Sequence, residues 1–317
     1  MGLPVKFQKA TRKQAKASIL IEGIQGQGKS GLALALAYYL GGENWDDVYA
    51  VDAENKSLCL FVGTPLHTGA QVGTFNVMEL SNQTGYKPSI YAACRDLAVA
   101  SKGKAIVNDS TTHMWQAKGG VLDMVTEASK TNKNKNAVWG EAEIMAEKQL
   151  IIDLMRSPDI HVINTVRMKE KVLYSTDETG NTFIEKAGEQ PIMAPGISFE
   201  PDLVLSMVKA GNSEGDAPIA KVDKSRYAIF KQYETYVFNE STIKQLREYL
   251  AEGADPAVIF EQQRQEYVEA AVALLDSNAS LKQIWTALKD KQGCKGMKID
   301  EIPLEKIKLL YSMLATD

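Results

Sequence analysis

Short apolar runs alternate with longer amphipathic segments over the first 240 residues of the chain. Runs of this kind predict buried strands, which we place at 18–21, 48–51, 75–78, 105–107, 161–163, 203–208 and 236–238. Apolar residues at helical spacing predict helices between them, at 31–40, 89–101 and 141–156. Buried strands that alternate with helices are typical of an α/β fold, in which a mostly parallel sheet is flanked by helices.

The pattern becomes entirely helical after Asn239. Apolar stripes predict helices at about 241–252, 256–276, 280–290 and 303–314, which together would form a small all-α C-terminal domain. The first sixteen residues carry five basic side chains and no acidic one: Lys6, Lys9, Arg12, Lys13 and Lys16. We therefore divide the chain into a basic N-terminal arm (1–16), an α/β core (17–240) and a helical C-terminal domain (241–317).

Two segments interrupt the alternation of strands and helices. Residues 128–138 are polar and rich in helix breakers, so we expect a mobile loop there. Residues 170–200 contain several glycines and prolines and fit either a long loop or a β-hairpin. Loops of this length inside a compact domain are more often functional than accidental.

Composition narrows the functional classes only a little. The net charge of −4 argues against a protein that coats nucleic acid, but it leaves room for a local basic channel. The three cysteines are far apart, which argues against a disulfide framework or a zinc site and favours a reducing, cytoplasmic setting. We find no apolar segment of the length needed for a signal peptide or a membrane span, so we expect no membrane association.

Residues 23–30 match the phosphate-binding sequence GxxxxGK[ST] in full: Gly23-Ile24-Gln25-Gly26-Gln27-Gly28-Lys29-Ser30. Glycines let backbone N–H groups curl around phosphate oxygens, and the N-terminus of the following helix adds its positive dipole end. Lys29 is expected to reach the β- and γ-phosphates, and the Ser30 hydroxyl is expected to bind Mg²⁺. A buried strand before the loop and a long helix after it make a chance match improbable. The sequence therefore predicts an ATP site.

A bound Mg²⁺ ion commonly takes a second ligand from an acid at the end of another buried strand. Asp109 has this position after the run at 105–107, although a solvated strand-end acid would look the same. Ser110 follows it rather than glutamate, so the base that activates water has to come from elsewhere. Glu54 is a candidate, because the carboxyl ends of parallel strands meet at one edge of a sheet.

Several motifs in this order resemble the core of the bacterial RecA recombinase: Asp52-Ala53-Glu54, Asp109-Ser110 and Asn164-Thr165-Val166-Arg167-Met168-Lys169. The same order resembles the RecA-like ATPases that many bacteriophages encode for recombination, including the Sak-type single-strand annealing group. Lys224-Ser225-Arg226-Tyr227 is similar to a motif of the related RadA proteins. The resemblance covers about residues 17–240 and implies a RecA-like P-loop ATPase core.

The resemblance implies roles for three residues outside the P-loop. Glu54 matches the catalytic glutamate that orients the attacking water, and the alternative is a surface carboxylate. Thr165 matches the polar residue that senses the γ-phosphate, a role that its neighbour Asn164 could share. Phe61 matches the aromatic residue that stacks on adenine, and an ordinary core phenylalanine is the alternative.

Lys224 and Arg226 match basic residues that, in RecA-like assemblies, reach the γ-phosphate of a neighbouring subunit as fingers in trans. This role implies a homo-oligomer, filament or ring, with ATP sites shared between subunits. The alternative is two solvated charges on an edge strand.

RecA-type proteins bind single-stranded DNA with two loops. One follows the strand that ends in the Mg²⁺-binding acid, here Asp109, and the other follows the strand that carries the phosphate-sensing residue, here Thr165. The first loop corresponds to about 111–140, where four lysines and two tryptophans suit a site that tracks the backbone and stacks bases. These residues are Lys118, Lys130, Lys133, Lys135, Trp115 and Trp139. The alternative is a solvated loop with the tryptophans packed beneath it. The second loop, 170–200, is acidic and does not suit DNA by itself.

The function that we predict is ATP binding and Mg²⁺-dependent hydrolysis by a phage-type RecA-like protein. It would bind single-stranded DNA and promote annealing or strand exchange, in the host cytoplasm if phage-encoded, with a single-strand-binding protein as a further partner. One alternative is a ring-forming helicase core or a helicase loader. Another is an ATP-gated interaction protein without DNA chemistry, which the acidic second loop favours.

Overall fold

The computed structural model describes residues 12–132, 134–176, 182–208, 217–277 and 281–314. Within these ranges, residues 15–250 form one compact unit, and the residues before 15 and after 250 form another. Residues 1–11 of the basic arm, with Lys6 and Lys9, lie outside the described residues. No helix in the described ranges is both long enough and apolar enough to cross a membrane.

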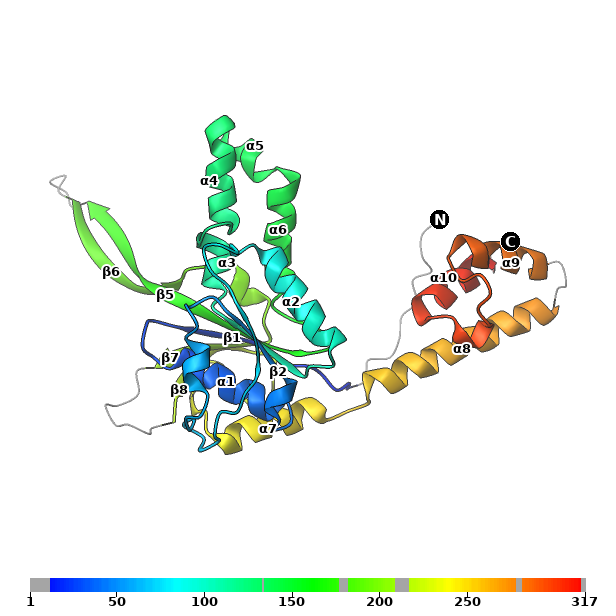
Figure 1. The fold of residues 1–317 in the computed structure, drawn as a ribbon, viewed down its shortest axis with the longest axis horizontal. Coiled ribbons are helices and arrows are strands. Elements are labelled where there is room, and N and C mark those ends of the chain that lie inside the picture. Colours follow the sequence, from blue (N-terminus) through cyan, green and yellow to red (C-terminus); the bar gives the residue numbers. More distant parts are fainter. Residues whose placement is uncertain (1–11, 133, 177–181, 209–216, 278–280, 315–317) are drawn as a thin grey trace. The chain divides into compact units, whose positions relative to one another are not determined.

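The larger unit is built on a mixed sheet of nine strands (Figure 1). Eight of them follow the order β3 (Asn76–Glu79), β2 (Val48–Asp52), β4 (Ala105–Asp109), β5 (His161–Thr176), β1 (Ser18–Gly23), β7 (Leu203–Val208), β8 (Ile219–Ser225) and β9 (Thr235–Val237). Neighbouring strands are parallel from β3 to β7, whereas β8 and β9 are antiparallel. The predicted α/β fold with a mostly parallel sheet is confirmed.

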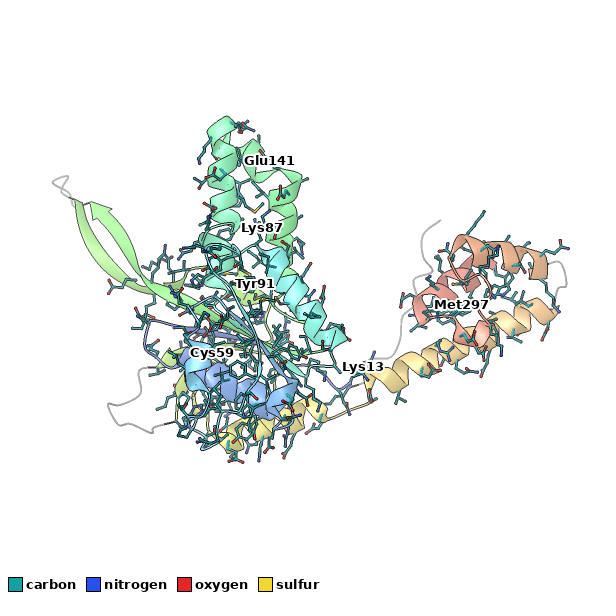
Figure 2. The ribbon with its side chains drawn as sticks, in the orientation of Figure 1. Lys13, Cys59, Lys87, Tyr91, Glu141 and Met297 are labelled. Atoms are coloured by element: carbon teal, nitrogen blue, oxygen red, sulfur yellow. The ribbon has the colours of Figure 1, made fainter. Side chains whose placement is uncertain are left out.

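Helices cover both faces of this sheet (Figure 1). One face packs against α1 (Lys29–Leu40) and α7 (Glu240–Ala251), and the other against α2 (Pro88–Ala100) and α6 (Ala142–Asp153). Alternate residues of β1 serve the two cores, since Ile19 and Ile21 belong to the first and Leu20 to the second. Figure 2 shows the side chains that fill these layers, with the buried Tyr91 of α2 labelled. A strand buried on both faces explains the uninterrupted apolar run at 18–21.

The prediction of a loop at 128–138 is wrong for most of this segment. Helix α4 (Val121–Thr131) continues through its first part, and α5 (Lys135–Trp139) occupies its end. The Asn134 side chain accepts hydrogen bonds from the backbone N–H groups of Asn136 and Ala137, so an asparagine that resembles a breaker acts as a helix cap. Val138 is buried in the second core and holds the short helix in place.

The segment 170–200 forms the β-hairpin that was one of its two predicted alternatives. Strand β5 continues well past the apolar run at 161–163 and pairs with β6 (Thr182–Pro191), and the two strands extend together beyond the sheet (Figure 1). A short 3₁₀ helix, η3 (Ile197–Phe199), leads into β7. The hairpin side chains at 172–187 lie outside the described part of the chain.

The second unit is helical, as expected for the C-terminal region. It contains α8 (Pro256–Ser277), α9 (Leu281–Lys291) and α10 (Leu304–Leu314). Its core contains the buried side chains Val268, Ala271, Trp285, Leu288, Ile307 and Leu310. The predicted apolar stripes of these helices therefore face one another in the core of this unit.

Candidate nucleotide-binding site

The P-loop lies between the end of β1 at Gly23 and the start of α1 at Lys29. Gly26 and Gly28 have φ values of 81° and 80°, a left-handed conformation that favours glycine. A Cβ atom on either residue would meet no other atom within 4 Å, so the space beside both glycines is open. The backbone thus has the curled shape and the free volume that a phosphate group needs.

Lys29 folds back under this loop. Its side chain is largely buried, and Nζ donates a hydrogen bond to the carbonyl oxygen of Ile24 at 2.9 Å. Burial lowers the pKa of Lys29, whereas the carboxylates of Glu54 and Asp109 raise it. The Gln27 side chain accepts from the Ile24 N–H at 2.8 Å, which completes the internal bonding of the loop. The Lys29 ammonium group therefore lies within hydrogen-bond reach of the loop backbone.

Asp109, the last residue of β4, is almost completely buried. One carboxylate oxygen, Oδ1, accepts a hydrogen bond from the Thr165 hydroxyl, while Oδ2 is buried without a hydrogen-bond partner among the described residues. Burial raises the pKa of Asp109, and the nearby hydroxyls of Ser30 and Thr165 lower it. An unpartnered buried carboxylate oxygen is costly, so this position fits a bound cation or its water.

Ser30 and Asp109 fit a Mg²⁺ ion whose other ligands are waters and the phosphates of a nucleotide. Within the described ranges, no group of three or more His, Cys, Asp or Glu side chains could hold a metal ion alone. Mg²⁺ commonly binds with one or two protein oxygens, several waters and the phosphates of its nucleotide. The Ser30 hydroxyl and Asp109 Oδ2 supply protein oxygens of this kind.

Glu54 is positioned by the turn that follows β2. The buried Asp52 carboxylate accepts hydrogen bonds from the backbone N–H groups of Glu54 and Leu58, each at 2.8 Å. Asp52 also pairs with Asp109 in the register of β2 and β4. Glu54 is therefore held at the same edge of the sheet as Asp109, as predicted from the strand ends. Asp52 itself is used as a turn-forming residue.

Arg167 is a residue of this site to which the sequence analysis assigned no role. Its Nε donates to Glu54 Oε1 at 2.8 Å, and its backbone N–H donates to the Thr112 hydroxyl at 2.9 Å. In the register of β1 and β5, Arg167 is the partner of Gly23 at the start of the P-loop. Burial alone would raise the pKa of Glu54, but Arg167 outweighs it and the pKa is lowered. The sequence feature that could have identified Arg167 as a site residue is its position two residues after Thr165 in the Asn164–Lys169 motif.

His113 and Ser110 lie next to this ion pair. The Ser110 hydroxyl and His113 Nδ1 are 3.1 Å apart, and Ser110 contributes to the lowered pKa of Glu54. Burial and the Arg167 charge lower the pKa of His113. A neutral imidazole is therefore favoured beside the arginine. His113 belongs to α3 (Thr112–Gln116), the short helix that follows β4.

Thr165 and Asn164 lie beneath the site. Both side chains are buried, and the Thr165 hydroxyl is engaged with Asp109. The Thr165 carbonyl oxygen accepts from the backbone and side chain of Thr111, and Asn164 accepts from the Asn108 side chain at 2.8 Å. In this arrangement both residues support the Asp109 strand end. Phosphate sensing by either one stays a prediction.

Phe61 is close to the P-loop helix. It ends a 3₁₀ helix (Leu58–Phe61), and its ring would lie 3.6 Å from a Cβ atom on Gly31. The ring is half-buried and packs against the first core. Stacking on an adenine ring therefore stays a prediction, and the position is compatible with it because α1 begins just two residues before Gly31.

Lys224 and Arg226 lie at the opposite edge of the sheet from the P-loop. Arg226 pairs with Asp202 at 2.6 Å, and the Asp202 backbone N–H donates to Ser18 at the start of β1. Gly23 is five positions after Ser18 along the extended strand, a span of roughly 16 Å at about 3.3 Å per residue. Lys224 donates to three backbone carbonyl oxygens, those of Ser198, Phe199 and Pro201. Neither side chain can serve its own P-loop, and a role in trans stays a prediction.

The lysines predicted to bind DNA are spread over several elements. Lys118 is exposed just after α3, and Lys130 pairs with Glu127 at 2.6 Å. Lys133 lies outside the described residues, and only the backbone of Lys135, at the start of α5, is described. Trp115 and Trp139 stack with ring centroids 6.1 Å apart, and Trp115 is buried. The two rings therefore pack on each other, as in the alternative interpretation of this loop.

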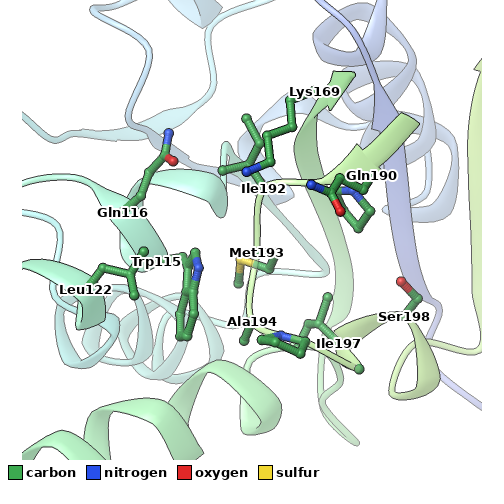
Figure 3. A pocket seen from close by; sticks show the side chains of 13 residues that line it. Trp115, Gln116, Leu122, Lys169, Gln190, Ile192, Met193, Ala194, Ile197 and Ser198 are labelled. Carbon is green, nitrogen blue, oxygen red and sulfur yellow. The ribbon is translucent and has the colours of Figure 1, made fainter. Parts of the chain in front are cut away.

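A pocket of about 350 Å³ lies beside Trp115 (Figure 3). Side chains of α3 and α4, including Trp115 and Leu122, form one side, and β5, β6 and the segment after β6 form the other. Most of the residues that line it are apolar, and Lys169 and Gln190 are among the polar ones. Two elements connect this pocket to the nucleotide site, because β5 carries both Arg167 and Lys169 and α3 carries both His113 and Trp115.

Neither the protein-family models nor the curated proteins contain a match to this chain. Its interpretation therefore rests on the motifs and the geometry of the site.

Proposed function

We propose that this chain is a Mg²⁺-dependent ATPase with a RecA-like core, of the kind that bacteriophages use in recombination. It would bind single-stranded DNA and promote annealing or strand exchange. One observation carries the proposal: three separate strand ends bring Lys29, Asp109 and Glu54 to the same edge of the sheet. A glycine-rich turn that matched by chance would not have the other two groups beside it.

Each residue has a role that its surroundings support. Lys29 would exchange the Ile24 carbonyl for β- and γ-phosphate oxygens, and the open side of Gly26 and Gly28 would take the rest of the phosphate chain. Ser30 and Asp109 would hold Mg²⁺, whose charge offsets that of the phosphates. Thr165 holds one carboxylate oxygen of Asp109, which would leave the second available to the ion.

The chemical step would be an in-line attack by water on the γ-phosphorus. An oxygen–phosphorus bond forms, the bond from the γ-phosphorus to the bridging oxygen breaks, and ADP leaves with the electron pair. The proton of the water passes to the Glu54 carboxylate. Because the pKa of Glu54 is lowered, this carboxylate is ionised and able to accept the proton at neutral pH.

The RecA-like part of the proposal is supported by where the shared motifs lie. Asp52-Ala53-Glu54 and Asp109-Ser110 follow neighbouring strands, and the Asn164–Lys169 motif lies in β5, between β4 and the P-loop strand. Lys224 and Arg226 lie at the other end of the sheet from their own P-loop, which suits fingers that serve a neighbouring subunit. An oligomer with ATP sites shared between subunits is part of this proposal.

DNA binding is supported by the pocket beside Trp115. An aromatic wall, apolar neighbours and the Lys169 ammonium group suit an unstacked base with its phosphate. Shared elements connect this pocket to the ATP site. A second candidate, an ATP-gated interaction protein without DNA chemistry, is favoured by the Lys130–Glu127 pair and by the packing of the two tryptophans on each other.

The proposal is tested by ATP hydrolysis with and without single-stranded DNA, on the full chain and on Lys29→Ala. We expect Mg²⁺-dependent hydrolysis that DNA stimulates, and loss of ATP binding by calorimetry in Lys29→Ala. Lys104→Ala is a matched control, because Lys104 pairs with Asp47 at the far edge of the sheet. Normal ATP affinity in Lys29→Ala would remove the P-loop assignment, and hydrolysis without any DNA binding would favour the second candidate.

A further inference from the structure

The ion pair between Glu54 and Arg167 uses the carboxylate that the proposed reaction needs. Glu54 Oε1 accepts from Arg167 Nε at 2.8 Å, and the Glu54 side chain is 24% exposed. A carboxylate bound in this way has its charge stabilised by the guanidinium and is less free to orient a water molecule. Hydrolysis through Glu54 therefore requires that this contact be loosened or rearranged.

The backbone of Arg167 is held in place, whereas its side chain is free to move. Its backbone is fixed, because β5 pairs it with Gly23 and its N–H donates to Thr112. Its side chain, in contrast, is 43% exposed. A long side chain with a fixed backbone and an exposed head can change partners without disturbing the sheet.

The second partner is defined by the position of Arg167 beside the P-loop. Its charge is close enough to Lys29 to lower the pKa of that ammonium group. A γ-phosphate held by Lys29 would therefore lie within the field of Arg167. Three cations that could compete for this role are placed elsewhere: Lys56 pairs with Glu79 at 2.8 Å, and Lys224 and Arg226 lie at the opposite edge.

We propose that Arg167 exchanges partners when ATP binds, leaving Glu54 for the terminal phosphate. Without nucleotide, Arg167 neutralises Glu54 and the carboxylate is occupied. With ATP, the more highly charged phosphate takes the guanidinium, which forms bidentate bonds to phosphate readily. Glu54 then becomes free to orient water, and only a nucleotide with a γ-phosphate produces this state. The inference rests on the proposed ATPase function and adds a residue that reads the γ-phosphate within the same subunit.

The test compares the affinities for Mg-ADP and Mg-ATPγS by calorimetry, in the full chain and in Arg167→Ala. We expect the preference for ATPγS over ADP to fall roughly tenfold or more in Arg167→Ala, because a charge-assisted bond to phosphate is lost. Affinity for ADP should stay within about twofold, since ADP has no γ-phosphate. Arg167→Lys keeps the charge and should recover part of the preference. Lys104→Ala removes a somewhat more exposed, paired cation elsewhere and should keep the whole preference.

Glu54→Gln gives an independent readout of the exchange. Without the carboxylate, ATPγS no longer has to displace an ion pair, so its affinity should rise roughly two- to fivefold while that of ADP does not. An unchanged preference for ATPγS in Arg167→Ala, with wild-type melting behaviour, would overturn the partner exchange. Failure of the parent chain to bind either nucleotide would instead overturn the proposed function.

Discussion

The hydroxyl of Thr165 donates a hydrogen bond to the carboxylate of Asp109, and both side chains are buried, Asp109 at the end of β4 and Thr165 within the adjacent strand β5. This contact fixes one carboxylate oxygen and leaves the other for a ligand. The motif residue expected to face the phosphate thus orients the residue expected to hold the metal ion.

Thr165→Val should lower the free energy of unfolding by about 1–3 kcal/mol, because a buried carboxylate oxygen loses its partner. Thr165→Ser keeps the hydroxyl and should cost less. Urea unfolding of the three proteins measures both effects. If both variants have the same free energy of unfolding as the parent chain, the Thr165–Asp109 contact does not stabilise the fold.

We expect Glu22 to make the free energy of unfolding depend on pH. It is buried next to Gly23, where burial raises its pKa from 4.5 to about 7 and the hydroxyl of Ser198, 3.1 Å away, partly opposes this. The folded pKa lies above the unfolded one, so the folded chain holds the proton more tightly. Stability from Glu22 is complete below about pH 4.5 and is lost as the pH rises to about 7 and above, by roughly 3 kcal/mol at most.

Glu22→Gln should remove this dependence, because its amide carries no charge at any pH. We expect the variant to be more stable than the parent at pH 8 and about equal to it at pH 4.5, measured by urea unfolding. The difference between the two proteins isolates Glu22 from His161, whose buried ring has its pKa lowered to about 3 and acts in the opposite direction. A difference that is the same at both pH values would contradict the assignment.

Glu54→Gln should bind ATP but lose turnover roughly a hundredfold or more, which corresponds to about 2.7 kcal/mol in the barrier. The amide cannot take the proton of the attacking water. Glu79→Gln is a suitable control, since Glu79 ends the neighbouring strand β3 and pairs with Lys56. Steady-state hydrolysis with saturating Mg-ATP measures the loss. Equal rates in both variants would show that the base lies elsewhere.

The parts of this site that could be predicted from the sequence are those fixed by local chemistry. The P-loop depends on eight consecutive residues, and the positions of Asp109 and Glu54 follow from apolar runs that end at a parallel sheet edge. The Glu54–Arg167 pair joins residues 113 positions apart and depends on the order of the strands. Neither periodicity nor spacing reports that order.

Two other features have physical causes that lie outside the local sequence pattern. The asparagine-rich segment after α4 contains a helix because Asn134 caps it and Val138 is buried in the core, which propensity alone does not include. Lys224 lies far from its own P-loop because β8 is antiparallel to β7 and returns the chain to the other edge. An alternating Lys-x-Arg pattern gives the face of a strand but not its direction.

Arg226→Ala should bind ATP almost normally and hydrolyse it poorly, if Arg226 serves the γ-phosphate of a neighbouring subunit. Its present contact, an ion pair with Asp202 at 2.6 Å, is half-exposed and contributes little to stability, so the variant should fold. The substitution should leave the P-loop of the same chain intact, because that loop lies at the far end of β1. A loss of hydrolysis would then have another cause.

Mixing two inactive variants distinguishes action in trans from a local effect. Arg226→Ala keeps an intact P-loop and Glu54, while Lys29→Ala keeps an intact Arg226. In a mixed oligomer, some interfaces join the intact Arg226 of one variant to the intact ATP site of the other. Finger residues contribute about 10³–10⁵ in rate, so even a few such interfaces should restore measurable hydrolysis. If the mixture stays inactive although pull-down confirms co-assembly, Arg226 does not act across the interface, and its pairing with Asp202 is its main role.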